Sequence, residues 1–179
     1  NTKKTKEMIL KFSKRVRTDL CTPLVYDCAV IDRVEEFKIL GIMVSSDLTW
    51  SRHVDYIVAR ANKRIFAICQ LVRCGFDHKD IVTVYCSLIR PVLEYASQVW
   101  HCGLTRTLSD EIERVQRRCL HIIYPQLSYS DALAVSGLQL LSVRRENAVI
   151  KLFNEIKNPA RFALSFAYKA SSKRICHSR

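Results

Sequence analysis

The spacing of apolar residues along the chain changes once, from short runs to a helical repeat. Before residue 48, apolar residues gather in short runs: Met8–Phe12, Leu24–Ile31 and Phe37–Val44. Short runs rich in β-branched and aromatic residues are typical of β-strands. We therefore predict three strands here, with Gly41 marking a bulge or a close backbone approach in the third.

After Ser45-Ser46-Asp47 the apolar residues recur at steps of three and four, which predicts an amphipathic helix of about six turns. Gly75 is expected to end this helix, because glycine is the usual residue just after a helix C-terminus. The residues predicted to face the core are Val54, Ile57, Ala61, Ile65, Ile68 and Val72.

Four more helices are predicted, over about 78–101, from about Ser109 to Pro125, over 130–135 and over 143–157. Pro91 should kink the first of these, since proline removes a backbone hydrogen bond. Asp110, Glu111 and Glu113 should form an acidic first turn in the helix predicted from about Ser109. In the 78–101 helix, the residues expected to face the core are Ile81, Val84, Leu88, Val92, Tyr95 and Val99.

Strands followed by helices, without βαβ alternation, predict an α+β fold. We expect a short antiparallel β region followed by an all-helical bundle. The predicted limits are 1–48 for the β region, 49–164 for the helices and 165–179 for a frayed basic tail.

The net charge of +12, from 29 Lys and Arg against 17 Asp and Glu, favours a polyanionic partner. An anionic membrane surface would also attract this charge, so charge alone does not choose between these partners. No apolar run is long enough to span a bilayer, and we expect no membrane partner. Two unbalanced basic clusters mark the predicted helices. They are Arg60, Lys63 and Arg64, and Arg114, Arg117 and Arg118.

The eight cysteines contain no C-x-x-C pair and are scattered through apolar patterns. This spacing favours reduced, mostly buried thiols and an intracellular location, nuclear or cytoplasmic. Two pairs, His101–Cys102 and Cys119–His121, could each offer two zinc ligands, but neither has the ligand spacing of a structural zinc site. We therefore predict no metal site and no cofactor.

Catalytic patterns are sparse. Neither adjacent carboxylate pair, at 35–36 or 110–111, has partners in the sequence that suggest a two-metal site, and we expect both pairs at the starts of elements. His53-Val-Asp55 has the spacing that opens an iron triad, but that chemistry needs a β-sandwich and this pair opens a predicted helix. No phosphate-binding glycine loop or nucleophile elbow occurs.

Several stretches, in order along nearly the whole chain, resemble the end of reverse transcriptases of non-LTR (LINE-like) retrotransposons. The first 8 residues resemble the N-x-x-K-T-x-x-M segment of the palm, and 37–54 resemble the primer-grip hairpin that leads into the thumb. Later matches to the thumb are Tyr85, Ile89–Ala96, Val99–His101, Ile112–Arg118, Tyr129–Leu133, Gly137-Leu138 and Arg144-Arg145.

This resemblance implies a template–primer partner, that is, RNA and RNA–DNA hybrid. Lys4 would stand at the palm lysine, a candidate general acid in the parent enzyme. Phe37, Lys38, Leu40 and Gly41 would stand at the primer grip. The family's catalytic carboxylates and their Mg²⁺ would belong to a segment upstream of Asn1, so we expect a piece of a longer protein and no polymerase activity from this chain alone.

Three alternatives stay open. Residues 1–50 also resemble the segment described as the N-terminal region of AlkB-homologue tRNA-modification enzymes. The chain could instead be a non-catalytic nucleic-acid-binding module derived from a retrotransposon. It could also be a helical interaction protein whose positive charge serves solubility.

Overall fold

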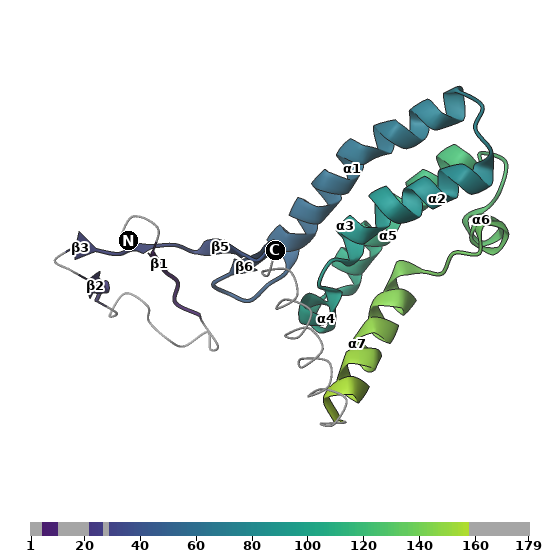
Figure 1. The fold of residues 1–179 in the computed structure, drawn as a ribbon. Helices are drawn as coiled ribbons and strands as arrows, with labels where there is room; N and C mark the ends of the chain where they lie inside the picture. Colours follow the sequence, from purple (N-terminus) through teal and green to yellow (C-terminus); the bar gives the residue numbers. More distant parts are fainter. Residues whose placement is uncertain (1–4, 11–21, 27–28, 158–179) are drawn as a thin grey trace, which may run out of the picture.

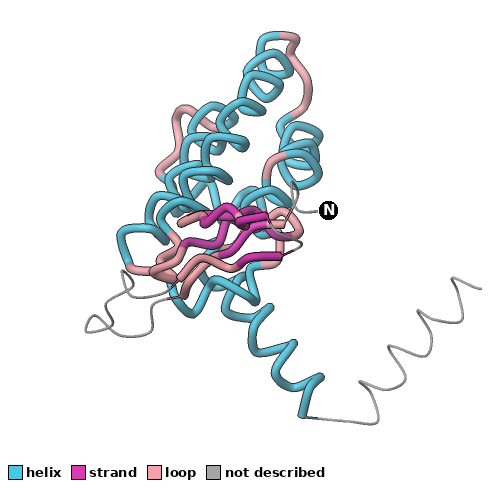
Figure 2. Tube along the Cα trace, turned by 90° about the vertical axis from the view of Figure 1, so that its left-hand side faces the viewer, coloured by secondary structure: helices cyan, strands magenta, loops and turns pink. Residues whose placement is uncertain are grey.

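The computed structural model describes residues 5–10, 22–26 and 29–157, and it has an α+β order, with short strands first and helices after them. The helices gather into one body, and the strands project from it as an arm (Figure 1). Figure 2 looks at the arm from its end, with the strands gathered in front of the lower part of the helices. The junction between the two parts lies between residues 45 and 51, where the predicted boundary at 48 falls.

Six short strands form three two-stranded sheets among the described residues. The strands are β1 Lys6–Glu7, β2 Val25–Tyr26, β3 Ala29–Val30, β4 Asp32–Arg33, β5 Glu36–Ile39 and β6 Ile42–Ser45. The pairs β2–β3 and β5–β6 are antiparallel, whereas β1–β4 is parallel. The predicted wholly antiparallel region of three strands is therefore wrong.

The predicted strand at 8–12 also lies elsewhere. β1 precedes it, at two charged residues, and 11–12 lie outside the described residues. Opposite charges explain this: Lys6 pairs with Asp32 at 2.5 Å and Arg33 with Glu7 at 3.1 Å across the β1–β4 ladder. Cross-strand ion pairs of this kind stabilise a ladder that apolar periodicity does not reveal.

The first helix, α1 (Ser51–Arg73), confirms the predicted helix and its core face. Five of the six predicted core residues are buried, and Val72 packs against the core from its edge. Cys74 and Gly75 follow the helix, and Gly75 has a φ of 75°. Most of the core lies between α1 and the later helices.

The predicted helix over 78–101 is three helices: α2 (His78–Leu88), α3 (Arg90–Glu94) and α4 (Ser97–Trp100), followed by the 3₁₀ turn η3 (His101–Gly103). Pro91 lies in the first turn of α3, a position where its missing N–H costs nothing. Ala96 has a φ of 50°, which separates α3 from α4. The predicted core face is also one residue out of phase from α2 onward, because the buried residues are Tyr85, Ile89, Leu93 and Trp100. Of the residues predicted to be core, Ile81 is buried, Val84, Leu88 and Val92 are half-buried, and Tyr95 and Val99 are exposed.

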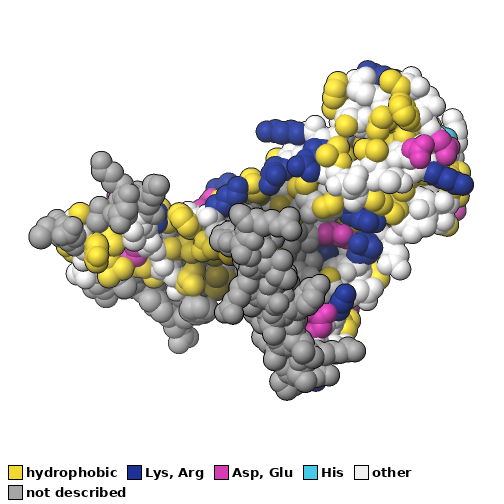
Figure 3. All heavy atoms as spheres, viewed as in Figure 1, with side chains coloured by type: hydrophobic (Ala, Val, Ile, Leu, Met, Phe, Trp, Pro, Cys, Tyr) yellow, Lys and Arg dark blue, Asp and Glu magenta, His cyan; other side chains and the backbone are white. Residues whose placement is uncertain are grey.

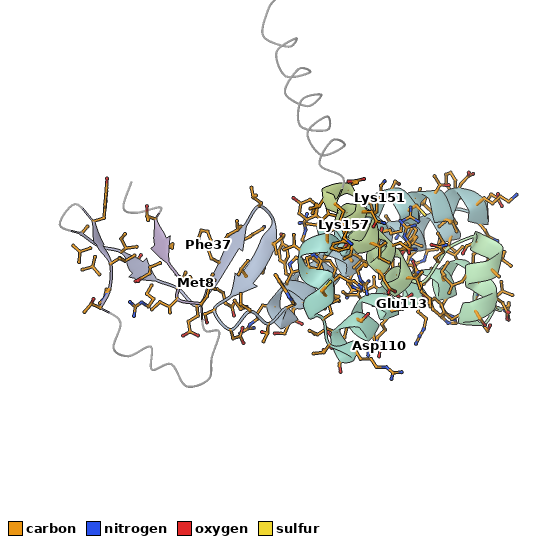
Figure 4. All side chains as sticks on the ribbon, turned by 90° about the horizontal axis from the view of Figure 1, so that it is seen from below. Met8, Phe37, Asp110, Glu113, Lys151 and Lys157 are labelled. Atoms are coloured by element: carbon orange, nitrogen blue, oxygen red, sulfur yellow. The ribbon has the colours of Figure 1, made fainter. Side chains whose placement is uncertain are left out.

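The last three helices are α5 (Arg106–Ile123), α6 (Tyr129–Ser136) and α7 (Leu141–Lys157). α5 begins a turn earlier than predicted, because Thr105 caps it by accepting the Leu108 N–H at 3.3 Å. The acidic residues expected in its first turn therefore lie deeper in the helix, and Glu113 is buried. Figure 4 shows Glu113 among the helices and Asp110 at their outer edge.

The cysteines differ from the prediction in burial. All five in the described part are free thiols, but only Cys119 is buried, while Cys74 and Cys102 are exposed. Burial raises the pKa of the Cys119 thiol to about 12. None of the described helices combines the length and the apolar character needed to cross a bilayer.

A candidate nucleic-acid interface at the hairpin and the first helix

The turn of the β5–β6 hairpin is built from two residues with positive φ, Leu40 at 49° and Gly41 at 90°. This conformation is the one that two-residue hairpin turns of type I′ require. Gly41 is therefore a turn residue and not a bulge, and of the two predictions made for it the close backbone approach is the one that fits. The Leu40 side chain is 86% exposed, so the turn presents an apolar tip to solvent.

Tyr95, at the end of α3, holds this turn against the helices. Its hydroxyl donates to the Leu40 carbonyl oxygen at 3.0 Å. Its ring lies so close to Gly41 that a Cβ there would meet Cε1 at 3.2 Å. A larger residue at 41 would therefore be strained by its φ and crowded by the ring.

A second attachment joins β6 to α1. The His53 imidazole accepts the Met43 backbone N–H on Nδ1 at 3.3 Å, and the whole side chain is buried. The rings of Trp50 and Trp100 contact it edge-on, with centroids at 6.2 and 5.3 Å. Burial lowers the pKa of His53, because the surrounding rings do not solvate an imidazolium.

Two cations from different elements converge on Tyr56. Lys38 of β5 donates to its hydroxyl at 2.7 Å, and Arg60 of α1 donates to the same oxygen at 3.1 Å. Both also lie over the ring, at 4.6 and 5.4 Å from its centroid. The hydrogen bond from Lys38 lowers the pKa of the phenol, with a smaller contribution from Arg60.

A groove of about 300 Å³ opens beside this cluster. It is lined by Gly41, Tyr56, Ile57, Arg60, Pro91, Val92 and Tyr95. Among the described residues no Asp or Glu lines it. We call these residues, together with Lys38, the hairpin–α1 site.

The other predicted cations of α1 differ in their surroundings. Lys63 is exposed, and within the described part of the chain it has no ion-pair partner. Arg64 is half-buried and donates through Nη1 to the Leu88 carbonyl oxygen at the end of α2. Arg64 therefore joins two helices, whereas Lys63 is available to a ligand. Figure 3 shows Lys and Arg side chains following α1 on the face in view.

The predicted basic cluster on α5 divides between two surfaces. Arg114 and Arg118 line a groove of about 350 Å³ toward α1, together with Asp55 and Glu111. Arg117 lies over the Tyr129 ring, 4.9 Å from its centroid. Because carboxylates line the groove beside Arg114 and Arg118, its charge is more balanced than that of the hairpin–α1 site.

The remaining predicted residues do not join this site. Phe37 lies on the arm, 39% exposed and away from the helices (Figure 4). Lys4 lies outside the described residues. The pairs at 35–36 and 110–111 do not come together, and Glu36 instead pairs with Arg52 at 2.8 Å. Within the described ranges, no group of three His, Cys, Asp or Glu side chains is arranged to hold a metal ion.

A buried polar network that joins α2, α5, α6 and α7 was missed by sequence reasoning. The Glu113 carboxylate accepts the Tyr129 hydroxyl, the Gln116 amide at 3.2 Å and the Leu141 backbone N–H at 2.9 Å. Gln116 in turn accepts the Tyr85 hydroxyl at 2.7 Å. The only signal in the sequence is that positions 112, 113, 116 and 120 share one face of the helix, which makes an acidic residue at 113 face inward.

Two neighbouring arginines hold α7 to the bundle. Arg144 forms a bidentate pair with Glu94, at 2.6 and 3.1 Å. Arg145 is fully buried, donates to the Ser109 hydroxyl at 2.9 Å and lies 5.8 Å from the centre of the Trp100 ring. Burial lowers the pKa of its guanidinium. These arginines, which belong to the stretches that resemble the thumb, therefore have a structural role here.

Comparison of the chain with protein-family models, with characterised proteins and with solved structures finds no significant match.

Proposed function

We propose that the chain is the end of the palm and the thumb of a non-LTR retrotransposon reverse transcriptase, and that it binds RNA–DNA hybrid duplex without catalysing polymerisation. The proposal joins the ordered resemblance over nearly the whole sequence to one geometric observation. That observation is the convergence of Lys38 and Arg60 on the Tyr56 hydroxyl.

Two cations so close together repel each other unless an anion approaches. No carboxylate lines the adjacent groove within the described residues. A phosphodiester supplies the missing negative charge, and neutralising it releases counterions from the nucleic acid. The chain as a whole carries a charge of +12, so the surrounding field also favours a polyanion.

The hairpin and α1 are held in a fixed relation by the bonds of Tyr95 and His53. A rigid turn beside a long basic helix suits the backbone of a duplex better than a specific base sequence, because phosphate contacts carry no sequence information. We therefore expect binding without sequence preference. The likeness of residues 1–50 to the AlkB-homologue segment stays a prediction.

Binding to a fluorescent hybrid duplex, titrated at several salt concentrations, tests this function. If about six phosphates are contacted, the logarithm of the affinity should fall with the logarithm of the salt concentration at a slope of about −5. Changing Lys38 and Arg60 to Glu should make the slope shallower by about one for each lost contact. Lys79→Glu, on the exposed start of α2, is the control and should change the slope little.

A slope near zero for the unchanged chain would favour a protein-interaction module instead. One observation supports that second candidate. Apolar side chains on α7 are exposed, among them Phe153 and Ile156, each at 54%. Exposed apolar residues clustered on one element are typical of protein–protein contact surfaces.

A further inference from the structure

The groove of the hairpin–α1 site is chemically divided. Its walls are largely apolar and aromatic, with the Tyr56 and Tyr95 rings and the Pro91 and Val92 side chains. Its charged rim is cationic, with Arg60 in the lining and Lys38 beside it. A ligand that fits must place an apolar or planar group next to an anion.

A nucleotide has this combination, because its base is planar and its phosphate is negative. The volume of about 300 Å³ lies at the small end of the range for ligand pockets, which matches one such unit and not a stretch of duplex. The aromatic walls matter as well, because bases stack on aromatic side chains whatever their sequence.

A base inside a duplex cannot use such a wall, since both of its faces are covered by neighbouring base pairs. It must first leave the stack, and this step costs least where the nucleotide is already unpaired. The occupant should therefore be an unpaired nucleotide at the end of a duplex.

We propose that the hairpin–α1 groove holds one unpaired nucleotide adjoining the bound duplex, with its base against Tyr56 and its phosphate at Lys38 and Arg60. This inference rests on the proposed nucleic-acid binding and adds a preference to it. The chain discriminates duplex ends by whether they carry a single-stranded extension.

The experiment compares two probes by fluorescence anisotropy: a blunt RNA–DNA hybrid, and the same hybrid with a short unpaired DNA extension. The extension should tighten binding about ten-fold, which corresponds to about 1.4 kcal/mol and lies within the range for stacking of one base. Tyr56→Phe keeps the ring and should keep most of this gain. Tyr56→Leu removes the ring and should lose it.

Phe66→Leu is the matched control, because Phe66 is a second exposed aromatic on α1 that does not line the groove. It should leave the gain unchanged. A fluorescent base analogue in the extension gives a second measurement with the unchanged chain, since its emission should be quenched by stacking. This measurement stands even if a Tyr56 variant fails to fold.

The outcomes separate the two proposals. If blunt and extended probes bind equally tightly with a clear salt slope, duplex binding stands and the unpaired-nucleotide site is overturned. If the gain survives in Tyr56→Leu, or is lost equally in Phe66→Leu, the extension binds elsewhere and the inference is again overturned. If neither probe binds, both proposals fail.

Discussion

His53 is the clearest case of a single residue whose ionisation is linked to the fold. Its Nδ1 already accepts the Met43 N–H. Protonation of Nδ1 would therefore turn an N–H of the imidazolium toward the N–H of Met43. Its other nitrogen, Nε2, is buried and without a hydrogen-bond partner among the described residues. The folded state therefore favours the neutral ring.

Stability should fall as the pH drops below about 6.5, the ordinary pKa of histidine, because the unfolded chain then takes up a proton that the folded chain refuses. His101, whose pKa is lowered by burial and by Arg145, adds to the same trend. Urea unfolding between pH 7.5 and 5 measures this. In His53→Asn, the amide oxygen can accept the Met43 N–H without titrating, so the slope should flatten.

The neighbours Lys63 and Arg64 should respond differently to the same substitution. Lys63→Glu should weaken binding to hybrid duplex while moving the free energy of unfolding by less than about 0.5 kcal/mol, as is usual for surface changes. Arg64→Glu removes the hydrogen bond to the Leu88 carbonyl oxygen and should destabilise the chain by about 1–3 kcal/mol. Thermal melting and binding, measured on both variants, test the pair. Equal melting temperatures would contradict the assignment of Arg64 to the helix contact.

At the scale of elements, the network around Glu113 joins α5, α6 and α7. Burial, followed by the bond to Glu113, raises the pKa of the Tyr129 phenol, so this hydroxyl remains a donor throughout the neutral range. The carboxylate accepts donors from three places in the chain, and no other residue type of this size offers two acceptor oxygens.

Replacing Glu113 by Gln should destabilise the chain by about 1–3 kcal/mol, because the amide nitrogen cannot accept and leaves one buried donor unpaired. Asp110→Asn, at the outer edge of the same helix, is the control and should change stability little. Chemical unfolding of both variants makes the comparison. A Glu113→Gln variant as stable as the unchanged chain would show that the network contributes little.

The sequence predicts the elements better than their breaks. The periodicity of α1 is unbroken for six turns and predicts its buried face closely, because apolar spacing and helix geometry coincide there. The apolar pattern over 78–101 looks equally continuous, but Ala96 adopts a positive φ, which an alanine in the sequence does not predict. The buried residues of this region, Tyr85, Ile89, Leu93 and Trp100, lie one position away from the predicted apolar face, and Tyr95 contacts the hairpin turn instead of the core. This part of the candidate site could not be predicted from periodicity, because the sequence offers two adjacent apolar faces here.

The same limit applies to the site as a whole. Lys38 and Arg60 are recognisable as cations in the sequence, but their meeting at Tyr56 depends on a hairpin docked by contacts 10 and 55 residues apart. Arg64 and Arg117 look like equivalent members of basic clusters. Only packing shows that one joins two helices and the other lies over an aromatic ring.

For the whole molecule, the proposed function predicts binding to nucleic acid without polymerisation. The charge is unbalanced, and the sequence contains no Tyr-x-Asp-Asp, the motif that carries the catalytic carboxylates in the family it resembles. A primed RNA template with Mg²⁺ or Mn²⁺ should not be extended by the purified chain, since two-metal phosphoryl transfer needs convergent carboxylates. Primer extension resolved on a sequencing gel, against a buffer blank, checks this. Template-dependent product above the blank would overturn the proposed function.

Two of the bonds that hold the hairpin to the helices use its backbone, the carbonyl of Leu40 and the N–H of Met43. Lys38 and Glu36 hold it through their side chains instead. A change of side chain at 43 should therefore leave the backbone attachment of the turn in place, provided that position 41 stays glycine. Substitution should be more restricted at Tyr95 and His53, because their side chains form these two bonds from outside the hairpin. In a library of random substitutions, tolerance should be high at 43 and low at 53 and 95, although 43 lies beside the turn and the other two do not. At 40, the positive φ of 49° should favour Gly, Asn and Asp.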